Sequence, residues 1–183
     1  MSERGKVKAS EAGAVLAGPS MSEAEATGRF RRWQMAGIIP TVGQDGEGRR
    51  APFLFDQSAP AIAAVLFWAH DHAGITERAM LASFWRFLAH PHHEHGVPAI
   101  DHVLAEVMAG GAPVLVLTRW GNAHTGEIQT TAALRFDDEY TRPIEGPSPD
   151  FDPIADIVLE LAPLLERFVG GNVLPFATPE AVN

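Results

Sequence analysis

The sequence predicts an α+β fold that is mostly helical and has two parts. In several segments apolar residues recur every three or four positions, and elsewhere two short apolar segments flank a glycine-rich stretch at residues 43–48. Charge is also unevenly distributed. Residues 1–100 hold ten Lys or Arg and ten Asp or Glu, whereas residues 101–183 hold four and thirteen. The second part therefore accounts for the whole net charge of −9, and we expect two modules with different tasks.

The first two expected elements are helices. Residues 10–16 form a short candidate helix, and a longer one is expected from Ser22 to about Met35. Ser22 followed by Glu25 three positions later is a capping-box pattern, in which each side chain bonds to a free amide of the first turn. Apolar residues on this helix are spaced four and three apart and predict one buried stripe: Ala26, Phe30 and Trp33.

A hairpin is expected next. Two short extended segments at residues 38–42 and 49–55 flank the glycine-rich tip at 43–48. Two further helices are then expected at residues 59–70 and 76–88, because their apolar positions follow helical spacing.

The second half is expected to contain a helix, two strands and a final helix. The first three elements lie at residues 98–108, 113–117 and 127–136. The final helix is expected over residues 152–168, because it opens with an Asp-Pro pair that suits a helix cap and a first helical position. The sequence thus predicts a small helix, two-strand and helix module.

Two domains are expected, at residues 7–90 and 97–183. The first has the order helix, turn, helix, glycine-tipped hairpin and further helices, which is typical of a winged helix-turn-helix DNA-binding domain. The acidic second domain is expected to serve dimerisation or the binding of an effector or another protein. No apolar run approaches the roughly 20 residues of a membrane span, and the first residues carry no signal-peptide pattern. We therefore expect a cytoplasmic protein with no membrane partner.

Seven side chains of the first domain are expected to contact double-stranded DNA. In such a domain one helix enters the major groove and the hairpin holds the adjacent backbone. Arginine suits both positions, because its planar fork pairs with phosphate oxygens or with a guanine edge. The candidates lie on the second helix and behind the hairpin tip: Thr27, Arg29, Arg31, Arg32, Gln34, Arg49 and Arg50.

The segment RFRRWQMAGIIP at residues 29–40 and the Gly-Arg-Arg of residues 48–50 resemble the N-terminal domain of the MerR family of transcription regulators. The resemblance covers about residues 7–88. It implies sequence-specific DNA binding by a homodimer at a palindromic site, and it names no inducer. Three features differ from the family pattern: the connection around residues 18–20 is longer, Ala-Pro at residues 51–52 replaces the usual tyrosine, and a strand pair is expected where the family has a long dimerising helix.

The sequence gives different support to two other function classes. A winged-helix protein-interaction module, such as an anti-repressor or adaptor, would keep this shape without binding DNA, and the net acidity together with Glu23 and Glu25 favours it. An enzyme is not expected, because the sequence has no nucleophile elbow and no dinucleotide fingerprint. With no cysteine in the chain, thiolate chemistry is excluded, and no cofactor is expected.

Histidines cluster in the middle of the chain. Histidine is the commonest metal ligand, but the run HPHHEH at residues 90–95 forms one loop without the helical HExxH spacing. We therefore assign no metal site, and metal binding by residues 70–102 stays open. The clustered histidines are His70, His72, His90, His92, His93, His95 and His102.

Overall fold

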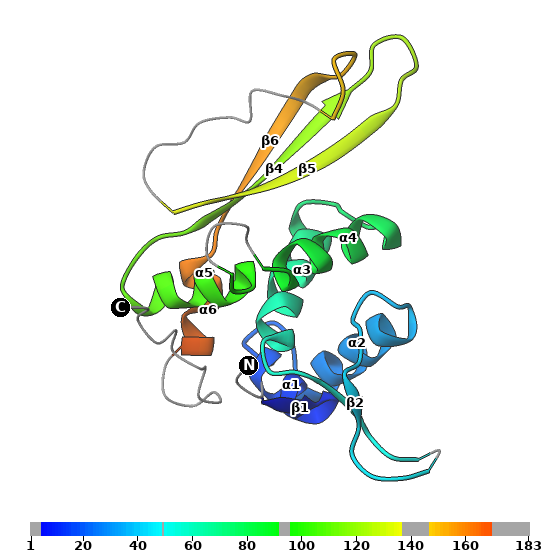
Figure 1. Cartoon of the computed structure of the whole chain (residues 1–183), viewed down its shortest axis with the longest axis vertical. Helices are drawn as coiled ribbons and strands as arrows, with labels where there is room; N and C mark the ends of the chain where they lie inside the picture. The colour runs from blue at the N-terminus through cyan, green and yellow to red at the C-terminus, as the bar shows by residue number, and fades with distance from the viewer. Residues whose placement is uncertain (1–4, 49, 92–95, 137–146, 170–183) are drawn as a thin grey trace.

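The computed structural model describes residues 5–48, 50–91, 96–136 and 147–169. These ranges contain six helices and two three-stranded antiparallel sheets (Figure 1). The chain therefore has the α+β fold that the sequence predicts. None of the helices in the described ranges combines the length and the apolar character needed to cross a membrane.

The N-terminal half opens with a short strand, β1 (Lys6–Lys8), that leads directly into α1 (Ala9–Leu16). Helix α2 (Glu23–Met35) follows, and then come strands β2 (Gly43–Gln44) and β3 (Phe53–Asp56). The sheet order is β1-β3-β2, with both pairs antiparallel. The N-terminal strand therefore closes the free edge of the hairpin.

The central helix of the molecule is α3 (Ala59–His72), and α4 (Arg78–Ala89) packs against it. Almost the whole first three turns of α3 are buried, because small alanines and branched apolar residues occupy every side of the helix. Helix α4 is amphipathic and buries only one face: Leu81, Phe84, Trp85 and Leu88.

The C-terminal half consists of α5 (Ala99–Met108), β4 (Val114–Gly121), β5 (Ile128–Arg135), β6 (Asp152–Glu160) and α6 (Ala162–Val169). Strand β4 is central in the sheet order β5-β4-β6. The strands run past the helices and extend beyond them at one end (Figure 1).

The expected helix over residues 152–168 is wrong in its first half, which forms strand β6. Its apolar residues satisfy helical spacing, but β4 is largely buried and needs a hydrogen-bonding partner on each side. Residues 152–160 supply the second partner. Pro153, which lacks an amide donor, sits beside an irregularity in the pairing, where a proline is tolerated. The module is therefore helix, three strands and helix.

The expected extended segment at residues 38–42 is also wrong, because the first hairpin strand, β2, begins at residue 43. Gly37 ends α2 in the left-handed region, with φ of +72°. The amides of Ile38 and Ile39 then donate to the carbonyl of Trp33 at 2.9 and 3.3 Å. The two buried isoleucines thus belong to the end of the helix and not to the hairpin.

One hydrophobic core spans both expected domains. Phe30 and Leu16 from the N-terminal half belong to the same buried cluster as Leu104, Leu117 and Leu165 from the C-terminal half. Helix α6 packs on α3 as well as on α5. The continuous core fixes the position of α6 relative to the N-terminal helices.

Candidate nucleic-acid interface

Helix α2 begins at a capping box, as the sequence predicts. The hydroxyl and the amide of Ser22 donate to the Glu25 carboxylate at 2.6 and 2.9 Å. The Ser22 hydroxyl oxygen accepts from the Glu25 amide at 3.4 Å. The bonds from the Ser22 hydroxyl and amide lower the pKa of Glu25 below its ordinary value. The cap fixes where the helix starts and hence which of its side chains face outward.

The packed face of α2 joins the helix to the hairpin. Ala26 and Phe30 are buried as expected, and Trp33 is half-buried. The ring of Phe30 packs edge-on against Phe55 of β3, with ring centroids 4.8 Å apart. The two elements expected to contact DNA are therefore held together by a core contact.

The outward face of α2 carries exposed arginines. Arg31 and Arg32 are exposed, whereas Thr27 and Gln34 are half-buried. Thr27 lies against Gly13 of α1, where an added Cβ would collide with the threonine side chain. Among the five candidate contacts on α2, the two exposed arginines are thus the most accessible to a partner.

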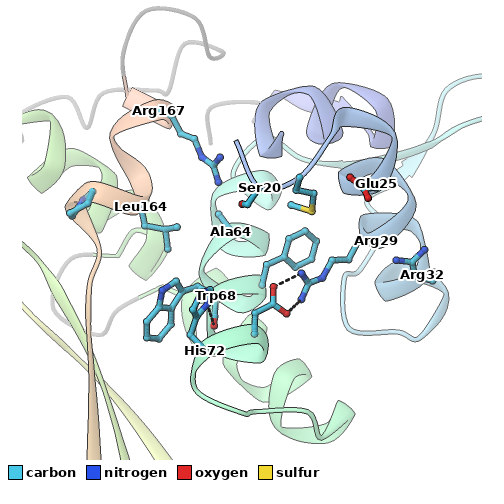
Figure 2. Close-up of a pocket in the computed structure, with 13 residues that line it drawn as sticks. Ser20, Glu25, Arg29, Arg32, Ala64, Trp68, His72, Leu164 and Arg167 are labelled. Atoms are coloured by element: carbon cyan, nitrogen blue, oxygen red, sulfur yellow. Dashed lines mark hydrogen bonds and ion pairs between the residues drawn. The ribbon is translucent and has the colours of Figure 1, made fainter. Parts of the chain in front are cut away.

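Arg29 points away from that face and toward α3 (Figure 2). Its guanidinium donates to both carboxylate oxygens of Asp71, at 2.6 and 2.7 Å, and lies 4.1 Å from the ring centre of Phe67. The arginine side chain is only 16% exposed. Arg29 therefore links α2 to α3 in a bidentate ion pair.

The ion pair controls the protonation of Asp71. Hydrogen bonds from Arg29 hold the pKa of Asp71 at about 2, against an ordinary value of 3.8, and they outweigh its partial burial, which acts in the opposite direction. A hydrogen bond with His70, whose Nδ1 lies 2.8 Å from Asp71, lowers it further. Asp71 is therefore ionised at neutral pH and neutralises the charge of Arg29.

The hairpin tip presents Arg50, which is exposed, while Arg49 lies outside the described residues. Gly46 and Gly48 have φ of +103° and +102°, a region that side chains with a Cβ rarely enter. The glycines recognised in the sequence thus allow the chain to reverse at the tip.

Two features of this surface were not predicted. Strand β1 places the exposed Lys6 beside the hairpin, and Lys8 forms an ion pair of 2.7 Å with Asp45. The hydrogen bond to Asp45 raises the pKa of Lys8. A three-residue strand has too short a pattern to be recognised from sequence. The partnership of Arg29 and Asp71 spans 42 residues, which local periodicity does not reach.

The histidine cluster is only partly within the described residues. His72 stacks on Trp68 with ring centroids 5.3 Å apart, and the ring of His102 packs edge-on against Phe136 at 4.3 Å. In the described part of the chain, no three potential ligands come together in a metal-binding group. The expected loop histidines that lie outside the described residues are His92, His93 and His95.

A comparison with known proteins finds no matching family model, no matching curated protein and no matching solved structure. The resemblance to the MerR family stays a prediction from residues 29–40 and 48–50. The geometry of α2 and the hairpin is therefore the basis for proposing a function.

Proposed function

We propose that the protein is a sequence-specific DNA-binding transcription regulator whose N-terminal half is a winged helix-turn-helix. The carrying observation is the exposed pair Arg31 and Arg32 on a helix whose other face is buried. The same helix is joined through Phe30 to a hairpin that projects from the helical body (Figure 1).

In this function α2 enters the major groove and the hairpin follows the adjacent backbone. The guanidiniums of Arg31 and Arg32 suit guanine edges or phosphates, and Arg50 and Lys6 suit phosphates. The N-terminal half is neutral overall, and the C-terminal half carries the net charge of −9. The acidic half repels DNA and so favours docking through the arginine-bearing surface.

Arg29 and Thr27 have a different role in this proposal from the one expected from sequence. Arg29 is held by Asp71, and Thr27 packs against α1. Both side chains fix the orientation of α2 on the helices behind it. They position the exposed arginines and do not themselves reach a base.

We propose that the regulator is a homodimer bound to a palindromic site, since readers of this type bind half-sites about 34 Å apart. Strand β6 lies at an edge of its sheet and exposes two large apolar side chains, Ile154 at 60% and Val158 at 50%. Exposed apolar residues on an edge strand favour pairing with a second chain.

A protein-interaction module is the second candidate, because one observation favours it. Glu23 and Glu25 are exposed in the first turn of α2. If that end of the helix faced DNA, both carboxylates would be repelled by phosphates. An anti-repressor or adaptor would use the same exposed helix to bind a protein.

Genomic DNA selection with the purified full chain tests the proposal. Fragments bound at about physiological salt are sequenced, and an enriched palindromic motif is expected. If a folded protein enriches no motif, sequence-specific DNA binding is contradicted. A pull-down in which a partner protein is retained independently of salt would then support the interaction module.

The double variant Arg31→Ala, Arg50→Ala tests the surface itself. We expect it to weaken binding to the selected motif by about tenfold or more, because each lost arginine contact contributes roughly 1–3 kcal/mol. Binding is measured by fluorescence anisotropy over a range of salt concentrations. The matched control is Arg86→Ala, because Arg86 is an exposed arginine of α4 that bonds to its own helix. Equal affinities of both variants would place the DNA interface elsewhere.

A further inference from the structure

A cleft of about 720 Å³ lies between α2, α3 and α6, on the side of α2 that faces away from Arg31. Figure 2 shows Arg29 and Arg32 of α2 on one side of it, and Leu164 and Arg167 of α6 on the other. Side chains of α3 line it between these two walls. The volume is within the range of small-molecule sites in proteins.

The part of the cleft formed by α3 is apolar and aromatic up to Trp68 and ends in Asp71 and His72. The half-buried Trp68 lines it together with the small side chain of Ala64, and Leu164 faces them from α6. Phe67 lies beneath the guanidinium of Arg29 and is only 4% exposed. The imidazole of His72 stacks on Trp68, with an interplanar angle of 15°. The stacked pair gives the cleft a flat ring system, which suits a planar apolar ligand.

The cationic side chains of the cleft differ in how far they are neutralised. Arg29 is paired with Asp71, as described above. In the described ranges no salt bridge involves Arg32 or Arg167. Among the described residues, Arg167 donates to the carbonyls of Leu16 and Ala17, at 3.3 and 3.4 Å. Partial burial of its guanidinium disfavours the charge and lowers the pKa of Arg167.

The two carboxylates of the cleft are already engaged. Glu25 accepts the hydrogen bonds of the capping box, and Asp71 holds Arg29. Three guanidiniums thus face two bonded carboxylates, so the charge left for a ligand is positive. Arg167 has further N–H groups beyond those on the carbonyls, and a carboxylate fits such a guanidinium edge with two parallel hydrogen bonds.

We propose that this cleft binds a flat aromatic carboxylate, with the carboxylate on Arg167 and the ring against Trp68 of α3. Arg32 is exposed and also lines the opposite wall, so it is shared between this cleft and the proposed DNA-binding face and adds a second positive charge to the cleft. Because one wall belongs to α2, the ligand would contact the helix that carries Arg31 from behind. Ligand binding itself does not require DNA and is measured without it.

Calorimetric titration of the DNA-free full chain with 2-naphthoate tests the site. Two reference ligands separate its parts: 2-naphthamide keeps the rings and lacks the charge, and acetate keeps the charge and lacks the rings. We expect 2-naphthoate to bind at least about tenfold more tightly than either, because only this ligand has both the charge for Arg167 and the rings for Trp68. The unmodified chain is sufficient for this comparison.

The variant Arg167→Gln is expected to weaken 2-naphthoate binding by about tenfold and to leave 2-naphthamide unaffected. Arg86→Gln, on α4 and outside the cleft, is the matched control and keeps the original affinity. Absence of 2-naphthoate binding up to about 10 mM, a dissociation free energy below roughly 3 kcal/mol, overturns the proposal. So does equal binding of 2-naphthoate and 2-naphthamide. Neither result bears on the proposed DNA binding, because the titration contains no DNA.

Discussion

Arg29 and Arg31 stand two residues apart on α2 and have opposite surroundings. Arg29 is half-buried against Phe67 and held by Asp71, whereas Arg31 is exposed and has no carboxylate partner in the described ranges. Successive residues of a helix are rotated by about 100°, so a separation of two places side chains on nearly opposite faces. A cluster of arginines in sequence therefore contains both a structural link and a free cation.

The two faces of α2 therefore serve two different properties, the stability of the fold and the binding of a partner. The inner face, with Ala26, Thr27, Arg29 and Phe30, determines how firmly α2 is held by α1, α3 and β3. The outer face, with Arg31, presents charge to a partner. Changes on the inner face should mainly alter the free energy of unfolding, and changes on the outer face should mainly alter binding.

The largest effect on stability is expected for Gly13→Val, which disrupts the contact between α1 and the inner face of α2. An added Cβ would meet both the side chain and the backbone of Thr27, so α1 and α2 would have to separate. We expect the free energy of unfolding to fall by about 3 kcal/mol, as in overpacked cores, measured by urea denaturation. Ala14→Val, on the exposed side of α1, is the control and should lose about 0.5 kcal/mol. Equal losses would contradict a close approach of α1 and α2.

Arg29→Ala should mainly lower the stability of the fold, and Arg31→Ala should mainly weaken binding. Removing Arg29 takes away the bidentate partner of Asp71, which keeps only His70, and uncovers Phe67, so we expect a loss of about 1–2 kcal/mol in the free energy of unfolding. Removing Arg31 should change the free energy of unfolding by less than about 0.5 kcal/mol and should weaken DNA binding instead.

A double-mutant cycle of Arg29→Ala with Asp71→Ala should give a coupling energy of about 1 kcal/mol, because Asp71 is 42% exposed and its charge is screened. Additive losses would show that the pair does not hold α2 to α3.

The pH dependence of stability should report the same pair. The pKa of Asp71 is about 2 in the folded chain and 3.8 in its ordinary range, so the folded state favours the ionised carboxylate. The resulting stabilisation is complete above about pH 5 and is lost as the pH falls from about 4 through 2. The stability difference between the natural chain and Asp71→Asn should therefore shrink between pH 6 and pH 3. A difference that stays constant would mean that Asp71 titrates normally.

Local signals in the sequence predicted most helices of the fold. The pattern of Ser22 and Glu25 marked the start of α2, and the spacing of apolar residues located α3, α4 and α5. Such signals depend on neighbours within one or two helical turns. Contacts between distant segments were not accessible in this way. Residues 152–160 fit a helix by spacing and became a strand because β4 needed a partner.

For the candidate surface, too, the sequence predicted local features and not the contacts between distant segments. Residue type and position identified Arg31 and Arg50 as candidates, and both are exposed. The pairing of Arg29 with Asp71 and the cleft beside it depend on how α2, α3 and α6 pack together. Within α2, the apolar stripe places Arg31 on the opposite face and Arg29 at the edge of the stripe. It does not identify Asp71, because that partner is on another helix.

The smallest effect is expected for Gly28→Ala, which tests whether this side of α2 has room for an added methyl group. An added Cβ there would meet only the flexible end of Arg32, at 3.5 Å, so the substitution creates no clash. Alanine restricts the unfolded chain and favours the helix, and we expect the free energy of unfolding to rise by about 0.5–1 kcal/mol. Ala24→Gly, one turn earlier and exposed, is the reverse control and should lower it by a similar amount. If Gly28→Ala destabilises the chain instead, this side of α2 is packed as tightly as the side that meets Gly13, and the contrast between its two faces fails.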